Sequence, residues 1–167
     1  MIIMGIDPGT ALMGYGIVHY SSNHFKPLTY GVLRTYKGEG PGQRLKILFE
    51  GLNRLMEEHR PEHVAVEALF FNKNITTALP VGQARGVALL SAALRELPIF
   101  EYTPLQVKQG VVGYGRADKS QIQFMVRAIL NLKEIPKPDD AADALAVAIC
   151  HGNSVIMNQK IGGVGLD

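Results

Sequence analysis

Three acidic sites interrupt apolar stretches that a folded protein would bury. Asp7 ends the apolar run IIMGI, Glu67 lies inside HVAVEAL, and Asp140 and Asp143 stand three residues apart in DDAADALAVAIC. A buried carboxylate that meets no cation is strongly destabilising. Four carboxylates without a His or Cys set at ligand spacing suit a hard, oxygen-seeking ion such as Mg²⁺. Two such ions about 4 Å apart would serve in-line displacement at a phosphate.

Each of these carboxylates also has a purely structural interpretation. Asp7 precedes Pro-Gly and could satisfy the amides of a turn, and Glu67 could pair with a buried arginine. Asp139 and Asp140 follow a proline, so one of them could cap a helix or stabilise its dipole. On a helix Asp140 and Asp143 lie about 60° apart, whereas Asp139 is turned away from Asp143 by about 160°. This geometry favours Asp140 and Asp143 as a pair and leaves Asp139 as a cap.

The hydrophobic pattern predicts the elements that must position these side chains. Alternation and short turns indicate strands near 2–7, 14–20, 25–36, 63–69 and 99–102, and helical spacing indicates helices near 42–59, 76–97, 118–132 and 140–150. This order predicts an α/β protein with a mixed sheet and helices on its faces. Strand ends and a helix start can meet at one edge of such a sheet, which would bring the four carboxylates together.

Composition and charge narrow the class of protein. The chain has 167 residues, 47% of them hydrophobic, which suits one globular domain and not a disordered protein. With no apolar run of membrane-span length, no visible secretory signal and a single cysteine, Cys150, we expect a cytoplasmic protein. Residues 73–137 contain nine Lys or Arg and four Asp or Glu, whereas residues 138–167 contain one and four. A basic middle beside an acidic end favours a polyanionic partner held near an acidic site.

Five segments of the chain resemble, in order, the motifs of the RuvC family of bacterial Holliday-junction resolvases. They are GIDPGTALMGYGI, VAVEALFFNKN, VGQARGVAL, PLQVKQGVVGYGRADKSQIQFMV and DDAADALAVAICH, and they cover about residues 1–152. The resemblance implies an α/β, RNase H-like fold with a mixed five-stranded sheet flanked by helices. It implies a nuclease domain over residues 1–152, followed by a flexible C-terminal tail over residues 153–167. The implied function is an endodeoxyribonuclease that makes paired symmetric nicks in four-way DNA junctions during recombination and repair.

The resemblance also assigns roles to particular residues. The family's catalytic and metal-binding carboxylates fall on Asp7, Glu67, Asp140 and Asp143. They imply Mg²⁺ as the cofactor, with two ions per active site and Mn²⁺ as a substitute. The implied partners are junction DNA, a second copy of the chain in a homodimer, and a branch-migration helicase complex of the RuvA and RuvB type.

DNA contacts are expected from one aromatic loop and from lysines. Phe70 falls on the family's aromatic position after the second carboxylate, and it could be a wedge that stacks on an unpaired base, or a core or dimer contact. Lys73 lies in the same loop and is expected to contact DNA. Lys119 opens a predicted helix, where backbone amides and its ammonium could hold a phosphate and offset transition-state charge, and Lys108 is similar. The alternative for these lysines is a solvated surface position.

Three further residues have other interpretations. Arg85 could serve the dimer or contact the DNA backbone, and the sequence does not separate these roles. Cys150 is expected in the core. His151 could support the carboxylates, but we expect it at a surface helix end, and the other histidines form no ligand pattern.

Proteins of other classes share parts of this pattern. GIDPGT also resembles the first phosphate hairpin of the actin and sugar-kinase superfamily, but that fold binds ATP between two such domains, and this chain supplies one. GYGRADKS looks like a P-loop, but Asp118 stands where a glycine is needed. Two further alternatives are a related RNase H-like nuclease that acts on RNA, and a non-cleaving module that binds junctions and recruits a helicase. The four carboxylates argue against the module, because acids facing phosphates weaken binding.

Overall fold

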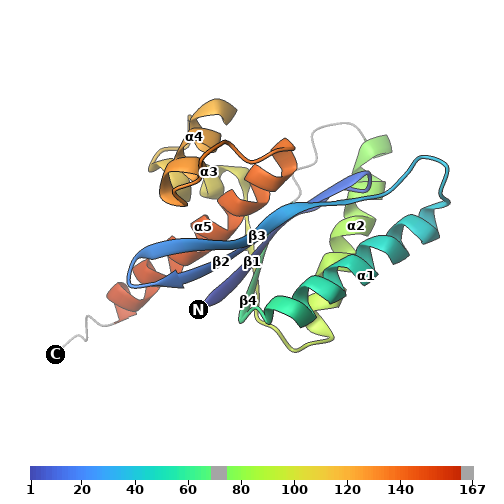
Figure 1. Ribbon diagram of the computed structural model, residues 1–167, viewed down its shortest axis with the longest axis horizontal. Helices are drawn as coiled ribbons and strands as arrows, with labels where there is room; N and C mark the ends of the chain where they lie inside the picture. The colour runs from blue at the N-terminus through green and yellow to red at the C-terminus, as the bar shows by residue number, and fades with distance from the viewer. Residues whose placement is uncertain (69–74, 163–167) are drawn as a thin grey trace.

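The computed structural model describes residues 1–68 and 75–162, which form five strands and five helices (Figure 1). In chain order these are β1 (Ile2–Asp7), β2 (Leu12–Ser21), β3 (His24–Arg34), α1 (Pro41–His59), β4 (His63–Glu67), α2 (Ile75–Ala93), β5 (Ile99–Tyr102), α3 (Pro104–Val112), α4 (Lys119–Ile129) and α5 (Asp139–Gly162). The order agrees with the predicted elements except for α3, which the hydrophobic pattern did not indicate.

The five strands form one mixed sheet in the order β3-β2-β1-β4-β5. Strands β1, β2 and β3 are antiparallel neighbours, whereas β4 runs parallel to β1 and β5 runs parallel to β4. Parallel neighbours place their carboxyl ends at the same edge of a sheet, so the ends of β1, β4 and β5 lie side by side. The predicted mixed five-stranded sheet is therefore confirmed.

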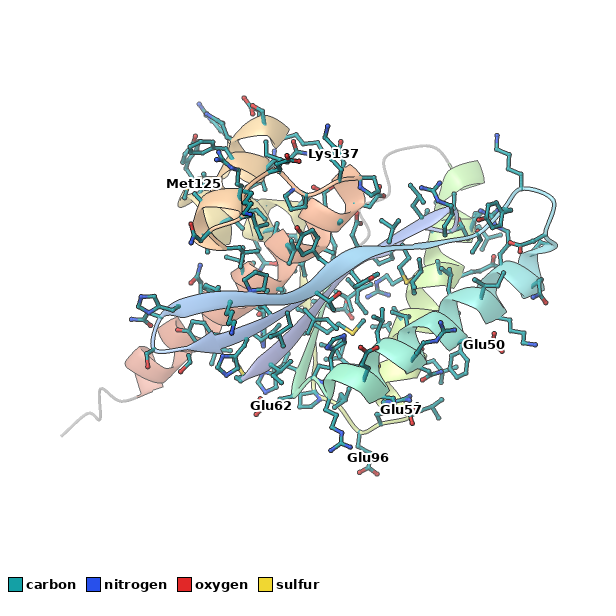
Figure 2. The ribbon with its side chains drawn as sticks, viewed as in Figure 1. Glu50, Glu57, Glu62, Glu96, Met125 and Lys137 are labelled. Atoms are coloured by element: carbon teal, nitrogen blue, oxygen red, sulfur yellow. The ribbon has the colours of Figure 1, made fainter. Side chains whose placement is uncertain are left out.

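Helices cover both faces of the sheet and give three layers (Figure 1). Alternate side chains of each strand divide between the layers: Met4 and Val64 pack with α1 and α2, whereas Ile3 and Ala65 pack under α5. Helices α3 and α4 lie against α5 on the same side (Figure 1). The side chains fill both interlayer spaces (Figure 2), so the central strands are buried on both faces. The last residues of β1 and β4 share the α5 face by the same alternation.

Two glycines of the sheet allow α5 to approach the strands closely. A Cβ on Gly5 would collide with the carbonyl oxygen of Ala144, and a Cβ on Gly14 would collide with the carbonyl oxygen of Asp140. Gly14 is also the register partner of Asp7 in the antiparallel pair β1–β2. The glycines of the GIDPGTALMGYGI segment therefore let the first turns of α5 lie directly over the end of β1.

The short helices α3 and α4 begin at side-chain caps. Thr103 accepts a hydrogen bond from the Gln106 amide while the Gln106 side chain accepts one from the Thr103 amide, and Asp118 and Gln121 do the same at α4. Asp118, the residue that breaks the P-loop pattern, is therefore the N-cap of α4. The α3 helix was missed because its nine residues include Pro104 and Gly110 and show little helical periodicity.

Helix α5 is longer than predicted. It runs to Gly162, so residues 151–162 continue the helix beyond the predicted end at Cys150. The prediction stopped there because the apolar run gives way to His151, Gly152 and polar residues. The division of the chain into a nuclease domain and a tail at residue 152 stays a prediction. Among the described residues, no helix is both long and apolar enough to cross a membrane.

Candidate active site

The four predicted carboxylates come together at one edge of the sheet. Asp7 is the last residue of β1 and Glu67 is the last residue of β4, and the parallel register brings these two strand ends level. Asp140 and Asp143 lie in the first turns of α5, above the same edge. Asp7 interacts electrostatically with each of the other three carboxylates.

Burial and mutual repulsion keep protons on this cluster. Burial, followed by the charges of Glu67 and Asp143, raises the pKa of Asp7 to about 8. The Asp7 carboxyl donates a hydrogen bond to Glu67, whose own pKa is raised by burial. Burial also raises the pKa of Asp143, although Lys119 opposes this. The cluster therefore holds more carboxylates than it can ionise near neutral pH without a further cation.

Among the described residues, Lys119 forms ion pairs with the acidic start of α5. Lys119 is the first residue of α4, and its Nζ lies 3.2 Å from Asp143 Oδ2 and 3.1 Å from Asp139 Oδ2. Burial acts to lower the pKa of Lys119, but the hydrogen bonds and charges of Asp139 and Asp143 outweigh it and raise that pKa. Lys119 is therefore a fixed positive charge between α4 and α5.

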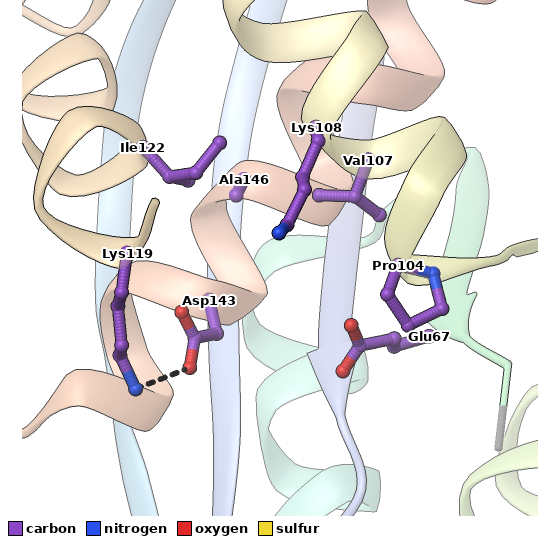
Figure 3. A pocket seen from close by; sticks show the side chains of 8 residues that line it. All are labelled: Glu67, Pro104, Val107, Lys108, Lys119, Ile122, Asp143 and Ala146. Atoms are coloured by element: carbon purple, nitrogen blue, oxygen red, sulfur yellow. Dashed lines mark hydrogen bonds and ion pairs between the residues drawn. The ribbon is translucent and has the colours of Figure 1, made fainter. Parts of the chain in front are cut away.

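A cavity of about 210 Å³ opens beside the carboxylates (Figure 3). Glu67 and Asp143 supply its acidic lining and Lys108 and Lys119 its basic lining, and the rest is apolar: Pro104, Val107, Ile122 and Ala146. Figure 3 shows the Lys108 ammonium directed toward the space between Glu67 and Asp143, with Lys119 beside Asp143. Carboxylates that can bind a cation therefore face ammonium groups that can bind a phosphate.

The donor set suits a divalent cation by its chemistry. Four carboxylates offer hard oxygen ligands, which Mg²⁺ and Mn²⁺ prefer and zinc does not require. Within residues 1–68 and 75–162, no three acidic, His or Cys side chains already have the arrangement of a complete metal site. Asp143 is paired with Lys119, and Asp7 and Glu67 both have raised pKa values because they are buried. A divalent cation would replace the Lys119 ammonium and the protons on these acids, so the residues fit it.

The predicted DNA-contact residues divide into two groups. Lys108 and Lys119 line the pocket. Phe70 and Lys73 lie outside the described residues, so their roles stay predictions. Arg85, whose role the sequence left open, forms an ion pair with Glu101 and thereby links α2 to β5.

The expectation of a surface position for His151 was wrong. The side chain is fully buried, with Nε2 2.8 Å from His63 Nδ1 and Nδ1 2.8 Å from Tyr102 Oη. Burial, followed by the charge of His63, lowers the pKa of His151 to about 4, so the ring is neutral at physiological pH. The error arose because α5 continues past residue 151, which therefore lies inside the helix. Cys150 is buried, as predicted.

Sequence reasoning missed the contacts of Asp139 and Gln123. Asp139 was predicted to cap α5, but its carboxylate accepts a hydrogen bond from Gln123 Nε2 at 3.0 Å and pairs with Lys119. Lys119 and Gln123 are four residues apart and so share one face of α4. That spacing was the only available signal, and it does not reveal which residue of another helix they contact.

The sheet order and its acidic edge define the class of the molecule. It is an RNase H-like protein, with a carboxylate cluster at the edge of its sheet where β1 and β4 end. The sequence model of the family described as crossover junction endodeoxyribonuclease RuvC matches residues 3–151. The chain therefore belongs to the RuvC family.

Individual relatives agree with this assignment. The chain is 62% identical to the crossover junction endodeoxyribonuclease RuvC of Alkaliphilus oremlandii, over 92% of this chain and 94% of that one. It is 58% identical to the protein of the same name from Pelotomaculum thermopropionicum, over 96% and 98% of the two chains. The structure of T. thermophilus RuvC in complex with Holliday junction substrate matches with a TM-score of 0.90 at 37% identity, over 95% of this chain and 96% of that one. The expected RNase H-like fold is confirmed.

Proposed function

We propose that this protein is a structure-specific endonuclease that resolves four-way DNA junctions by paired nicks in opposing strands. One observation carries the proposal: four carboxylates from β1, β4 and α5 converge beside a pocket with two lysines. Membership of the RuvC family and the T. thermophilus relative solved with a Holliday junction support a DNA junction as the substrate.

The carboxylates Asp7, Glu67, Asp140 and Asp143 hold Mg²⁺, two ions at each site, with Mn²⁺ as a substitute. When bound, these ions activate water and neutralise charge at the scissile phosphate. The fold of the chain fixes the positions of these carboxylates. Strands β1 and β4 fix one pair of carboxylates, and the closely packed α5 fixes the other pair.

The lysines of the pocket act on the DNA phosphate. Lys108 and Lys119 come from different helices but line the same cavity as Glu67 and Asp143. Their ammonium groups orient the phosphate and offset the charge that develops on its oxygens in the transition state. Phe70 acts as a wedge against an unpaired base, an assignment that rests on the family resemblance, and Lys73 binds DNA from the same loop.

Paired nicks require two equivalent sites, and α2 supports a homodimer. Leu79 and Leu90 are 66% and 51% exposed and share one face of α2 with Gly86, and Leu94, which is 63% exposed, directly follows the helix. Apart from its chain neighbours and the adjacent backbone of α2, no atom of the described residues lies within 4 Å of the position that a Cβ on Gly86 would take. A second copy of α2 could therefore approach closely along this apolar stripe, as a two-fold symmetric contact requires. A branch-migration helicase complex of the RuvA and RuvB type is a further partner, and this assignment rests on the family resemblance alone.

The experiment is incubation of the protein and Mg²⁺ with a mobile four-way DNA junction, with nicks mapped on all four strands. A linear DNA duplex of the same sequence and an RNA–DNA hybrid serve as controls. We expect nicks at symmetric positions in two opposing strands of the junction only. Cleavage of the hybrid instead would favour the RNA-directed nuclease, and tight binding without nicks would favour the non-cleaving module.

A further inference from the structure

Lys119 forms ion pairs with two carboxylates of α5, one that lines the pocket and one that is exposed outside it. Asp143 belongs to the proposed metal centre and lines the pocket, as Figure 3 shows. Asp139 lies one turn earlier and is exposed. The ammonium therefore bridges a carboxylate that is needed for the metal and one that is not.

Asp139 is itself held in place by α4. Its Oδ1 accepts the hydrogen bond from Gln123 Nε2, and its Oδ2 pairs with Lys119 Nζ, so the two oxygens have separate partners. The Asp118–Gln121 capping box fixes the first turn of the same helix. Asp139 thus forms a fixed contact between α4 and α5 that does not depend on Asp143.

We propose that Lys119 is a resident counter-ion of Asp143 that yields this carboxylate to a divalent cation, and that Asp139 is the positioning residue that retains the released ammonium. This inference rests on the proposed function, because it requires that Asp143 bind the cation. A divalent cation on Asp143 repels the nearby ammonium, whereas the ion pair with Asp139 remains available. Lys119 then stays beside the pocket, with N–H groups free for a phosphate oxygen.

A double-mutant cycle on cation binding tests this inference without any cleavage. Mn²⁺ is titrated calorimetrically into the DNA-free protein at low ionic strength for wild type, Lys119→Met, Asp139→Asn and the double variant. We expect Lys119→Met to bind Mn²⁺ roughly three- to tenfold more tightly, because no ammonium competes for Asp143. We expect Asp139→Asn to bind about threefold more weakly, because Lys119 is then left with Asp143 alone. In the Lys119→Met background, Asp139→Asn should have little effect.

Lys108→Met is the matched control, because it removes the same charge from the same pocket but breaks no ion pair of the described residues. Its effect on Mn²⁺ affinity should be smaller than that of Lys119→Met. If Asp139→Asn weakens binding equally with and without Lys119, Asp139 acts only as a distant charge and the inference is overturned. If Lys108→Met and Lys119→Met have equal effects, it is overturned as well. Failure of the wild type to bind Mn²⁺ at all would overturn the proposed function, and this inference with it.

Discussion

At the scale of single residues, Asp7 reduces the stability of the metal-free fold. Its carboxyl is buried beside other acids, which raises its pKa to about 8 from the ordinary value of 3.8. The folded protein therefore binds the proton more readily than the unfolded chain. The contribution of Asp7 to stability therefore decreases as the pH rises from about 4 to about 8. A carboxylate placed for cation binding is thus destabilising when no cation is present.

The variant Asp7→Asn should stabilise the metal-free protein, because asparagine has no proton to lose. We expect the gain to grow from pH 5 to pH 8, where it should reach on the order of 1–3 kcal/mol. Thermal denaturation in the presence of a chelator at both pH values measures it. Glu57→Gln, which neutralises an exposed acid on α1, is the control and should show no such trend. An equal gain at both pH values, or none, would argue against the protonation of Asp7.

Residue-level prediction from the sequence succeeded where a side chain violated its local pattern. Asp7 and Glu67 could be found because each interrupts an apolar strand, and the structure brings both to one edge. The ion pair of Lys119 with Asp139 could not be predicted, because a charged residue at the start of a helix breaks no local apolar pattern. Only the packing of α4 on α5 joins them, and no local pattern encodes that contact.

At the scale of elements, α5 positions half of the carboxylates, and its position depends on the sheet glycines. The collision partner of a Cβ on Gly14 is the backbone oxygen of Asp140, which cannot rotate away as a side chain could. We expect Gly14→Ala to cost about 1–3 kcal/mol of stability, because the helix must shift. Misplacement of Asp140 and Asp143 should lower single-turnover junction cleavage roughly tenfold or more.

The comparison for Gly14→Ala is Gly38→Ala, at a site where no described atom lies within 4 Å of the new Cβ. Melting temperature and cleavage rate are measured for both variants, together with junction affinity in the absence of divalent ions. Gly38→Ala should behave as wild type in all three. A Gly14→Ala protein with wild-type stability and rate would show that close packing of α5 is unnecessary.

The buried His151 makes the same helix sensitive to acid. The folded protein binds a proton on His151 only near pH 4, whereas the ordinary pKa is 6.5, so its contribution to stability is lost as the pH falls from about 6.5 toward 4. We expect His151→Phe to be less stable at pH 7 by about 1–2 kcal/mol, because its contacts with His63 and Tyr102 are lost. The difference between the two proteins should narrow at pH 5. Urea unfolding at both pH values tests this, and a constant difference would contradict it.

Most element types could be predicted from the apolar pattern, and so could the ends of β1 and β5, but α3 and the end of α5 could not. Helices α1 and α4 follow clear apolar periodicity, whereas α2 is apolar on most sides and was predicted from the length of its segment before Pro98. Helix α3 depends on a capping box and on packing against α5, which short-range hydrophobicity does not report. Helix α5 continues through a polar segment after the core ends, so the pattern marked the end of burial and not the end of the helix.

At the scale of the whole molecule, the exposed stripe of α2 predicts the assembly. Leu90→Glu places a charge in the middle of this stripe and should convert the proposed dimer to a monomer without unfolding the chain, because Leu90 is exposed in the single chain. Sedimentation velocity at micromolar concentration measures the change. Leu105→Glu, at an exposed position on α3, should leave the dimer intact. A Leu90→Glu protein that sediments with the wild type would place the interface elsewhere.

The central claim is that the four converging carboxylates are the catalytic centre, and single-turnover nicking of a mobile four-way junction tests it most directly. Asp7→Asn and Asp140→Asn are compared with wild type and with Asp139→Asn, and junction binding is measured in parallel without divalent ions. We predict that both carboxylate variants lose at least roughly a hundredfold in nicking rate with Mg²⁺ while they still bind the junction. Asp139→Asn should lose only about three- to tenfold, because it loosens Lys119 and removes no metal ligand. Near wild-type nicking by Asp7→Asn or Asp140→Asn would contradict the assignment of the centre.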